Sequence, residues 1–234
     1  MKKIIITAGG TSEKIDNVRK ITNSSSGKLA LTIAKTLLKE YKDIWIDYIC
    51  SKSALRPNEE RARIIEVEGV LEVKRAVEEL LTNSKIDYFI HTMAVSDYRT
   101  DYVTTLEKLR ESLQKEEEIE TLKGNKISSQ EKNVVVVLKP TPKIISLVKD
   151  ISPSTYLVGF KLLDGVQKEY LIEVAKNLRD KNKCDLVIAN DLETIRKGKH
   201  LAYLIDKKDN IEKANGKEEI AKKLVKKIAK NERI

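Results

Sequence analysis

Short apolar runs alternate with helical stretches along this chain, and that alternation limits the possible fold more than any other feature. Lys2–Ala8 is a β-branched run, Gly27–Lys39 carries apolar residues at helical spacing, and Ile44–Cys50 returns to a strand pattern. Strands separated by helices are joined by crossover connections, which make neighbouring strands parallel. The sequence therefore predicts an α/β fold with a Rossmann-like, mostly parallel sheet and flanking helices.

The rest of the chain continues the pattern except in its middle. Strands are expected at Arg63–Val67, Ile86–Thr92, Asn133–Leu138, Thr155–Leu162 and Asp185–Ala189, helices at Val70–Leu81, Pro142–Asp150, Lys168–Lys183 and Lys217–Lys230, and a hairpin at His200–Ile205 with Asn210–Ala214. Thr104–Gly124 is charged, helical in composition and closed by a glycine. We expect one domain, 1–234, with a protruding middle portion and a mobile segment near 104–128.

Composition narrows the class of partner. Lys and Arg number 45 against 36 Asp and Glu, a formal charge of +9. A basic excess can indicate nucleic acid or a membrane surface, but much of it lies in Lys217–Arg233, where lysines interleave with apolar residues as on a solvated helix face. The remaining excess suits a polyanionic small molecule.

Cys50 and Cys184 are expected to be buried free thiols. With no apolar run of 18 residues and no signal peptide, a cytoplasmic protein with no membrane partner is expected.

The segment after the first strand indicates phosphate chemistry. Gly9 and Gly10 follow Lys2–Ala8, and the loop leading to the next helix is rich in donors: Arg19, Asn23, Ser24, Ser25, Ser26 and Lys28. Backbone N–H groups in Gly-rich turns and at helix starts bind anions. The spacing matches neither the dinucleotide fingerprint nor the P-loop. A purely structural interpretation, a tight turn and a helix N-cap at Ser25 or Ser26, explains the glycines and serines equally well.

Four motifs in order resemble one enzyme family. The first runs from Gly9 to Gly27, and the others are Met93–Tyr98, Lys126–Ser129, and Val158–Lys161 followed by Ala189–Asp191. This arrangement resembles phosphopantothenate–cysteine ligase, also called phosphopantothenoylcysteine synthetase, in its stand-alone bacterial form. The resemblance implies a ligase of coenzyme A biosynthesis that joins 4′-phosphopantothenate to L-cysteine through an acyl-cytidylate, giving phosphopantothenoylcysteine, CMP and pyrophosphate. It also implies CTP as co-substrate, although eukaryotic relatives use ATP, together with Mg²⁺ carried with the nucleotide and a homodimer.

The resemblance assigns the reacting groups to three residues. Asn23 matches the asparagine that holds the acyl-nucleotide, and Arg19 matches an arginine near the phosphopantothenate and the acyl phosphate. Lys126 matches the first lysine of a Lys-x-Lys-Lys motif that binds the triphosphate, but Ser128 and Ser129 replace the later lysines. Without the resemblance, Asn23 would be a helix cap and Arg19 a surface charge.

Binding residues follow from the same matches. The implied nucleotide contacts are Gly9, Gly10, Ala94, Asp97, Lys126, Pro142, Ile144, Ile145, Phe160 and Lys181, and the implied substrate contacts are Arg19, Asn23, Ser25, Ser26 and Gly27. Lys143 replaces an aspartate of the family, and the alignment near Lys176 and Lys181 slips by one residue, which favours Lys181. Asp97 could instead cap a turn, Phe160 could be a core residue, and His91 is expected to pack within its strand. No metal ligand is expected from protein side chains.

Two other classes of protein compete with this interpretation. A short-chain NAD(P) reductase would share the α/β sheet, but the glycine fingerprint is missing, and the one Tyr-x-x-x-Lys, Tyr203–Lys207, lies in the expected hairpin. A nucleic-acid-binding module would share the basic charge, but aromatic and basic residues do not interleave. We expect no nucleic-acid partner.

Overall fold

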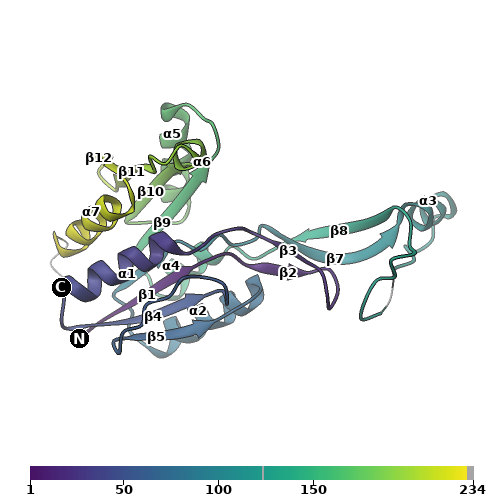
Figure 1. Cartoon of the computed structure of the whole chain (residues 1–234), viewed down its shortest axis with the longest axis horizontal. Coiled ribbons are helices and arrows are strands. Elements are labelled where there is room, and N and C mark those ends of the chain that lie inside the picture. The colour runs from purple at the N-terminus through teal and green to yellow at the C-terminus, as the bar shows by residue number, and fades with distance from the viewer. Residues whose placement is uncertain (123, 231–234) are drawn as a thin grey trace.

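An eight-stranded sheet forms the centre of the molecule in the computed structural model, which describes residues 1–122 and 124–230 (Figure 1). Its strands are, in spatial order, β12 (Ile211–Asn215), β11 (Leu201–Asp206), β10 (Leu186–Asp191), β9 (Tyr156–Leu163), β6 (Tyr88–His91), β1 (Lys2–Ala8), β4 (Ile44–Cys50) and β5 (Ala62–Glu66). From β10 to β5 all pairs are parallel, and β11 and β12 add an antiparallel edge. The predicted parallel sheet and the predicted hairpin are confirmed. The last residues of the basic stretch, 231–234, lie outside the described part.

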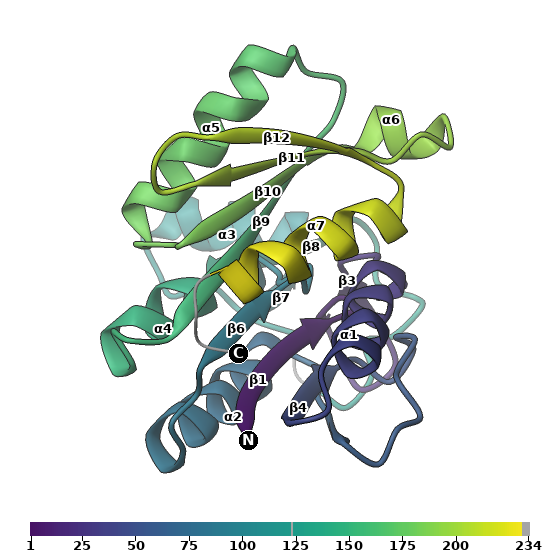
Figure 2. The same ribbon diagram turned by 90° about the vertical axis from the view of Figure 1, so that its left-hand side faces the viewer.

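Helices cover both faces of this sheet (Figure 2). One face packs against α1 (Lys28–Glu40) and α7 (Lys217–Lys230), and the other against α2 (Val70–Asn83), α4 (Ile144–Ile151) and α5 (Lys168–Lys181). The two cores are built mostly from Ile, Leu and Val, which suits strands buried on both faces. A short helix, α6 (Leu192–Arg196), follows β10. Within the described ranges, no helix is long and apolar enough to cross a membrane.

The middle of the chain forms an extended arm, defined here as residues 98–140 (Figure 1). β7 (Tyr98–Thr105) and β8 (Val134–Pro140) pair antiparallel, and α3 (Leu106–Lys115) lies at the far end. The predicted protruding portion is therefore confirmed, but its helix is shorter than the charged stretch Thr104–Gly124. Thr104 and Thr105 belong to β7, and the Thr105 side chain caps α3 by accepting from the Lys108 N–H. The Val-rich strand is half-exposed along most of its length, which suits a two-stranded ribbon and not the buried sheet.

Two helix starts and one loop differ from the sequence-based expectations. The N-cap of α1 is Gly27, with φ +69°, and no side chain caps it; the Ser26 Oγ accepts only a long 3.4 Å bond from the Lys28 N–H. The N-cap interpretation of the serines is therefore wrong. α4 begins at Ile144, after Pro142, because Thr141 is tied back to Ser96 and Asp97 and the chain is still extended at Lys143. The donor-rich loop contains a hairpin of β2 (Ser12–Lys14) and β3 (Lys20–Thr22).

Candidate functional site

A cavity of about 700 Å³ opens where the strand order reverses, at the carboxyl ends of β1, β6 and β9. Open α/β sheets bind ligands at such a point, because the connections leave neighbouring strands in opposite directions. The walls are residues 24–30, 91–97, 141–146 and 160–162, with Leu178, Lys181, Asn182, Asn190, Ile195, His200 and Lys217 completing them. Four segments that are far apart in the sequence therefore meet in one cavity.

A crossing of two backbone segments fixes one wall. The Asn23 N–H donates to the Thr11 carbonyl at 3.0 Å, and the Thr11 N–H donates to the Ala94 carbonyl at 3.1 Å. A Cβ at Gly10 would lie 1.7 Å from the Asn23 carbonyl oxygen, so only glycine permits this approach. The crossing joins the ends of β1 and β6 and directs residues 24–27 into the cavity wall.

Hydroxyl groups hold the adjoining wall. The Thr11 hydroxyl accepts from the Ser96 N–H at 2.8 Å and donates to the Ser96 Oγ at 2.9 Å, while the Thr141 Oγ1 donates to the Ser96 carbonyl at 2.5 Å. All three side chains are buried, so the network is shielded from water. It sets the positions of Asp97 and of residues 141–143. The Asp97 carboxylate forms an ion pair with the Lys143 ammonium at the start of α4.

The cavity is strongly basic. Lys28, Lys143, Lys161, Lys181 and Lys217 line it, and Asp97 is the one acidic side chain among the described lining residues. The starts of α1 and α4 also form part of the wall, and neither helix has a side-chain cap or an acidic residue in its first turn. Free N–H groups and the helix dipole favour an anion at such a start. The cavity is thus suited to a ligand with several negative charges.

Neutral hydrogen-bonding groups lie at another part of the wall. Asn190 is 5% exposed and His200 8% exposed, and the Asn190 Nδ2 and His200 Nδ1 have no hydrogen-bond partner within the described residues. Burial, helped by the nearby Lys217 charge and opposed by Glu218, lowers the pKa of His200 to about 4. Sequence reasoning assigned no role to either residue, although Asn190 stands inside the Ala189–Asp191 motif. The position of His200 beside it is produced by the β10–β11 pairing and had no signal in the sequence.

Most of the predicted binding residues meet in this cavity. Lining positions are occupied by Ser25, Ser26, Gly27, Ala94, Asp97, Pro142, Ile144, Ile145, Phe160 and Lys181. Gly9, Gly10 and Asn23 belong to the backbone crossing beside it: a Cβ at Gly27 would lie 3.3 Å from the Gly9 nitrogen. Lys28, His91, Lys161 and Lys217 also line the cavity and were not predicted to do so.

Arg19 and Lys126 lie elsewhere. Neither is among the described lining residues of the cavity. Their segments are joined to each other: the Arg19 Nη2 donates to the Ile127 carbonyl at 2.8 Å, and the Ile127 N–H donates to the Asp16 Oδ2 at 3.1 Å. These contacts attach the outer loop of the arm, which connects α3 to β8, to the turn of the β2–β3 hairpin. Within one chain, the segments that carry the two predicted cations are joined to each other, and neither cation lines the cavity.

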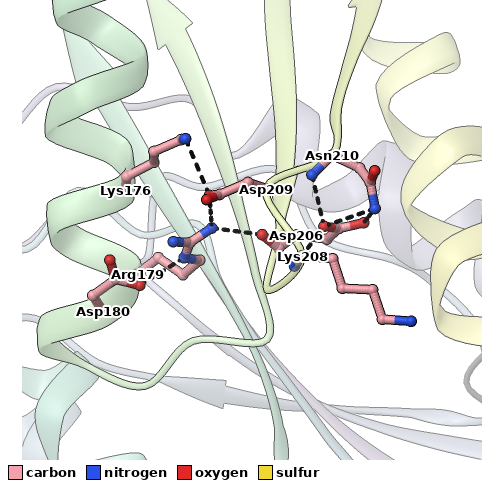
Figure 3. A network of polar contacts seen from close by, with 7 residues as sticks. All are labelled: Lys176, Arg179, Asp180, Asp206, Lys208, Asp209 and Asn210. Atoms are coloured by element: carbon pink, nitrogen blue, oxygen red, sulfur yellow. Dashed lines mark hydrogen bonds and ion pairs between the residues drawn. The ribbon is translucent and has the colours of Figure 1, made fainter.

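Lys176 and Lys181 lie in different surroundings. Lys176 belongs to a network that ties α5 to the β11–β12 turn (Figure 3). Its Nζ lies 3.1 Å from the Asp209 Oδ1, and the buried Arg179 donates to the same oxygen at 2.7 Å and to the Asp206 carbonyl at 2.6 Å. Lys176 is thus paired in a structural network, whereas Lys181 lines the cavity.

Comparisons with known proteins gave matches over most of the chain. The family model of the DNA/pantothenate metabolism flavoprotein C-terminal domain matches residues 1–231. The coenzyme A biosynthesis bifunctional protein CoaBC of Thermococcus kodakarensis is 36% identical over 192 residues, which are 82% of this chain and 42% of that protein. CoaBC of Methanocaldococcus jannaschii is 29% identical over 231 residues, 97% of this chain and 50% of that protein. The chain therefore spans about half the length, or less, of these relatives.

Solved structures share the whole fold. The DNA/pantothenate metabolism flavoprotein from Streptococcus pneumoniae superposes with a TM-score of 0.88 at 39% identity, covering 99% of this chain and 100% of that one. The C-terminal domain of a CoaBC protein gives 0.72 at 25% identity, covering 97% of this chain and 93% of that one. The chain belongs to the family of the DNA/pantothenate metabolism flavoprotein C-terminal domain, which confirms the resemblance to phosphopantothenate–cysteine ligases carried by its four motifs.

Proposed function

We propose that this chain is a phosphopantothenate–cysteine ligase that activates its substrate with CTP. The observation that carries the proposal is the convergence of three of the four motif segments on one basic cavity at the switch point of the sheet, the Lys126–Ser129 segment lying outside it. Relatives named as coenzyme A biosynthesis proteins support the same activity. The proposed products are phosphopantothenoylcysteine, CMP and pyrophosphate.

The reaction requires two displacements. A carboxylate oxygen of 4′-phosphopantothenate attacks the α-phosphorus of the nucleotide, and the bond to the β-phosphate oxygen breaks as pyrophosphate leaves. The cysteine amine then attacks the acyl carbon, loses a proton, and CMP leaves with the oxygen it shared with that carbon. Lysines and uncapped helix starts stabilise the charge on the phosphates. Asn23 supplies a neutral donor that can hold the acyl phosphate without forming an ion pair with the substrate carboxylate.

Mg²⁺ is proposed to enter with the nucleotide. Within the described residues, no group of three or more His, Cys, Asp and Glu side chains could hold a metal ion. The lining carboxylate of Asp97 is already paired with Lys143. The residues present therefore fit a metal held mainly by phosphate oxygens, which is the usual arrangement for Mg²⁺. When bound, the ion would spread the charge of the leaving pyrophosphate.

A homodimer is also proposed, because Arg19 and Lys126 lie outside the cavity of their own chain. Apolar side chains on the arm support a second copy of this chain as partner: Tyr98, Leu113 and Leu138 are 56%, 66% and 42% exposed. In a two-fold dimer, arms that cross would bring the same cations to both cavities.

The test is an incubation with 4′-phosphopantothenate, L-cysteine and Mg²⁺, with CTP and ATP compared. We expect one pyrophosphate and one CMP per product, with CTP the better co-substrate. Release of a nucleoside diphosphate and orthophosphate would contradict the acyl-nucleotide route.

Two variants test whether the activity belongs to the cavity. Asn23→Asp should lower turnover by on the order of 100-fold, because a carboxylate repels the acyl phosphate and a preorganised donor is lost. Asn83→Asp introduces the same charge at an exposed position at the end of α2 and serves as control. Melting temperatures should be the same for both variants. Full turnover by Asn23→Asp would remove this residue from the site.

A further inference from the structure

His91 is a histidine in the lining of the cavity, and its ring has a defined orientation. It is the last residue of β6, between Thr7 of β1 and Gly159 of β9 in the sheet register. The His91 Nδ1 lies 2.9 Å from the Thr7 Oγ1, and the side chain lines the cavity. Thr7 is fully buried, so the ring edge carrying Nδ1 faces the protein. The opposite edge, with Nε2, is the part that a ligand can reach.

The hydrogen bonds around Thr7 fix which ring nitrogen carries the proton. The Thr7 Oγ1 accepts from the Met93 N–H at 3.2 Å. Its own hydroxyl proton is buried and needs an acceptor, and among the described residues the His91 Nδ1 is the acceptor within reach. Nδ1 therefore accepts, and the proton of the neutral ring is on Nε2. Burial lowers the pKa of His91 to about 4, so the ring stays neutral at physiological pH.

The surroundings of His91 suit an uncharged, flat ligand group. Gly159 pairs with His91 on the neighbouring strand, and the space that a Cβ there would take is filled by apolar neighbours: Ile145, Cys184 and Val187. Ile144 and Ile145 of α4 line the same cavity, and a Cβ at Gly159 would lie 3.1 Å from the Ile145 Cδ1. The side chains of Ile144 and Ile145 offer no hydrogen bond to a phosphate, whereas a heterocyclic ring buries its faces on them and keeps its polar edge paired with the neutral His91 ring. The N–H groups at the start of α4 are then left to the phosphates.

We propose that His91 is a specificity-determining residue of the nucleotide site, where its Nε2–H donates a hydrogen bond to an uncharged acceptor on the base. Thr7 is the positioning residue that keeps Nε2 protonated. The lysines and the helix starts then bind the phosphates, and His91 contributes only to binding of the base. This division of roles rests on the proposed nucleotide-dependent function.

The test compares ligands with and without a base. Dissociation constants for CTP, CMP and inorganic tripolyphosphate are measured by calorimetry for the native chain, His91→Phe and His91→Gln. In His91→Phe, loss of one hydrogen bond to a neutral acceptor should weaken the binding of CTP and CMP about 3- to 10-fold. The binding of tripolyphosphate should stay within about 2-fold of the native value. His91→Gln places an amide N–H near the Nε2 position and should recover most of the affinity. The proposal would be overturned if His91→Phe weakened tripolyphosphate binding as much as CTP binding, or if it left CTP and CMP binding unchanged.

A second measurement follows the ligand response of the native chain itself, with a variant used only to assign the signals. The sequence has two histidines, so ¹⁵N-histidine spectra contain two imidazole systems, and the His91→Gln spectrum identifies one of them. We expect the Nε2-protonated neutral form for His91 and a shift of its Nε2 signal on adding CMP but not tripolyphosphate. An Nδ1-protonated ring, or a signal insensitive to CMP, would overturn the assignment. Failure of the ligase assay with intact CMP binding would reject the proposed reaction and leave the His91 contact standing.

Discussion

The Asn23 carbonyl oxygen occupies the space that any side chain at Gly10 would need. Gly10 does not have a positive φ, so the restriction comes from this close approach and not from backbone conformation. The same crossing supports Thr11, Ala94 and the wall that begins at Ser24. A single missing Cβ therefore determines whether the first motif can reach the cavity.

Gly10→Ala should destabilise the chain by about 3 kcal/mol or more, because the new methyl group collides with backbone that cannot rotate away. Gly198→Ala is the matched control: Gly198 has φ +75° with nothing within 4 Å of a Cβ, so only about 1 kcal/mol of left-handed strain is expected. Urea unfolding of both variants measures the difference. Similar losses in the two would show that segment 22–24 can shift without cost.

Lys126 is an exposed side chain, so its substitution should affect ligand use and not folding. We expect Lys126→Gln to lower kcat/KM for the nucleotide by on the order of 10- to 100-fold, because a cation on the leaving pyrophosphate is lost. Lys132→Gln changes another exposed lysine of the arm and should retain full activity. An unchanged kcat/KM for Lys126→Gln would exclude this lysine from the reaction.

At the scale of elements, Asp185 joins α4, β9 and the β11–β12 turn. Its carboxylate accepts from Lys149 at 2.8 Å, from Lys207 at 2.6 Å and from the Leu157 N–H at 2.8 Å. Burial by itself would raise the pKa of Asp185, but these hydrogen bonds outweigh it, and the pKa lies below its usual value. The stabilisation is therefore fully present above the unfolded pKa, near 3.9, and is lost as pH falls through the folded value.

Asp185→Asn should lower the free energy of unfolding by about 2–3 kcal/mol at pH 7, because a half-buried charge pair is broken. Asp150→Asn, at an exposed position on α4, serves as control. The difference between native chain and Asp185→Asn should shrink as the pH is lowered below about 4, as followed by urea unfolding. A difference independent of pH would assign the loss to packing alone.

The outer loop of the arm is expected to close over the triphosphate. Within the arm, the Leu122 N–H donates to the Val103 carbonyl at 2.7 Å, and Glu120 contacts Thr104, Ser112 and Lys108. Beyond Gly124, the Asn125 carbonyl accepts from the Asn17 N–H of the β2–β3 turn. Gly124 has φ +135°, a conformation that allows a hinge. Limited proteolysis should cut within 104–128 without nucleotide and less with CTP and Mg²⁺. Equal cleavage in both conditions would contradict the lid.

For the whole molecule, the proposed dimer can be tested by mixing inactive variants. If Lys126 acts on the cavity of the partner, a heterodimer of Asn23→Asp and Lys126→Gln chains contains one cavity with both native residues. Mixing and exchanging the two variants should then restore about a quarter of native activity, the share expected for random pairing in a two-fold dimer. No recovery after confirmed subunit exchange, or a monomer by light scattering, would contradict the shared site.

The alternation of apolar runs and helices was enough to predict the parallel sheet, the two helical layers and the hairpin, because burial on both faces leaves a strong pattern in the sequence. The four motifs were enough to indicate the family, and three of them, together with the matches at Pro142, Ile144 and Ile145, indicated most of the cavity wall. The paired glycines predicted a tight turn at β1, and the charged middle predicted a protrusion. These features depend on short-range sequence patterns.

Only the tertiary structure decided which segments meet. The Val-rich strand pairs with β7 and not with the sheet, and Arg19 joins residues 125–127 and not the cavity. Lys176 is bound by Asp209 while Lys181, five residues later, lines the cavity. His91 was expected only to pack in its strand, but its ring orientation depends on the contact with Thr7. Such contacts join residues from 29 to 108 positions apart, and neither periodicity nor composition records which distant partner a side chain will find.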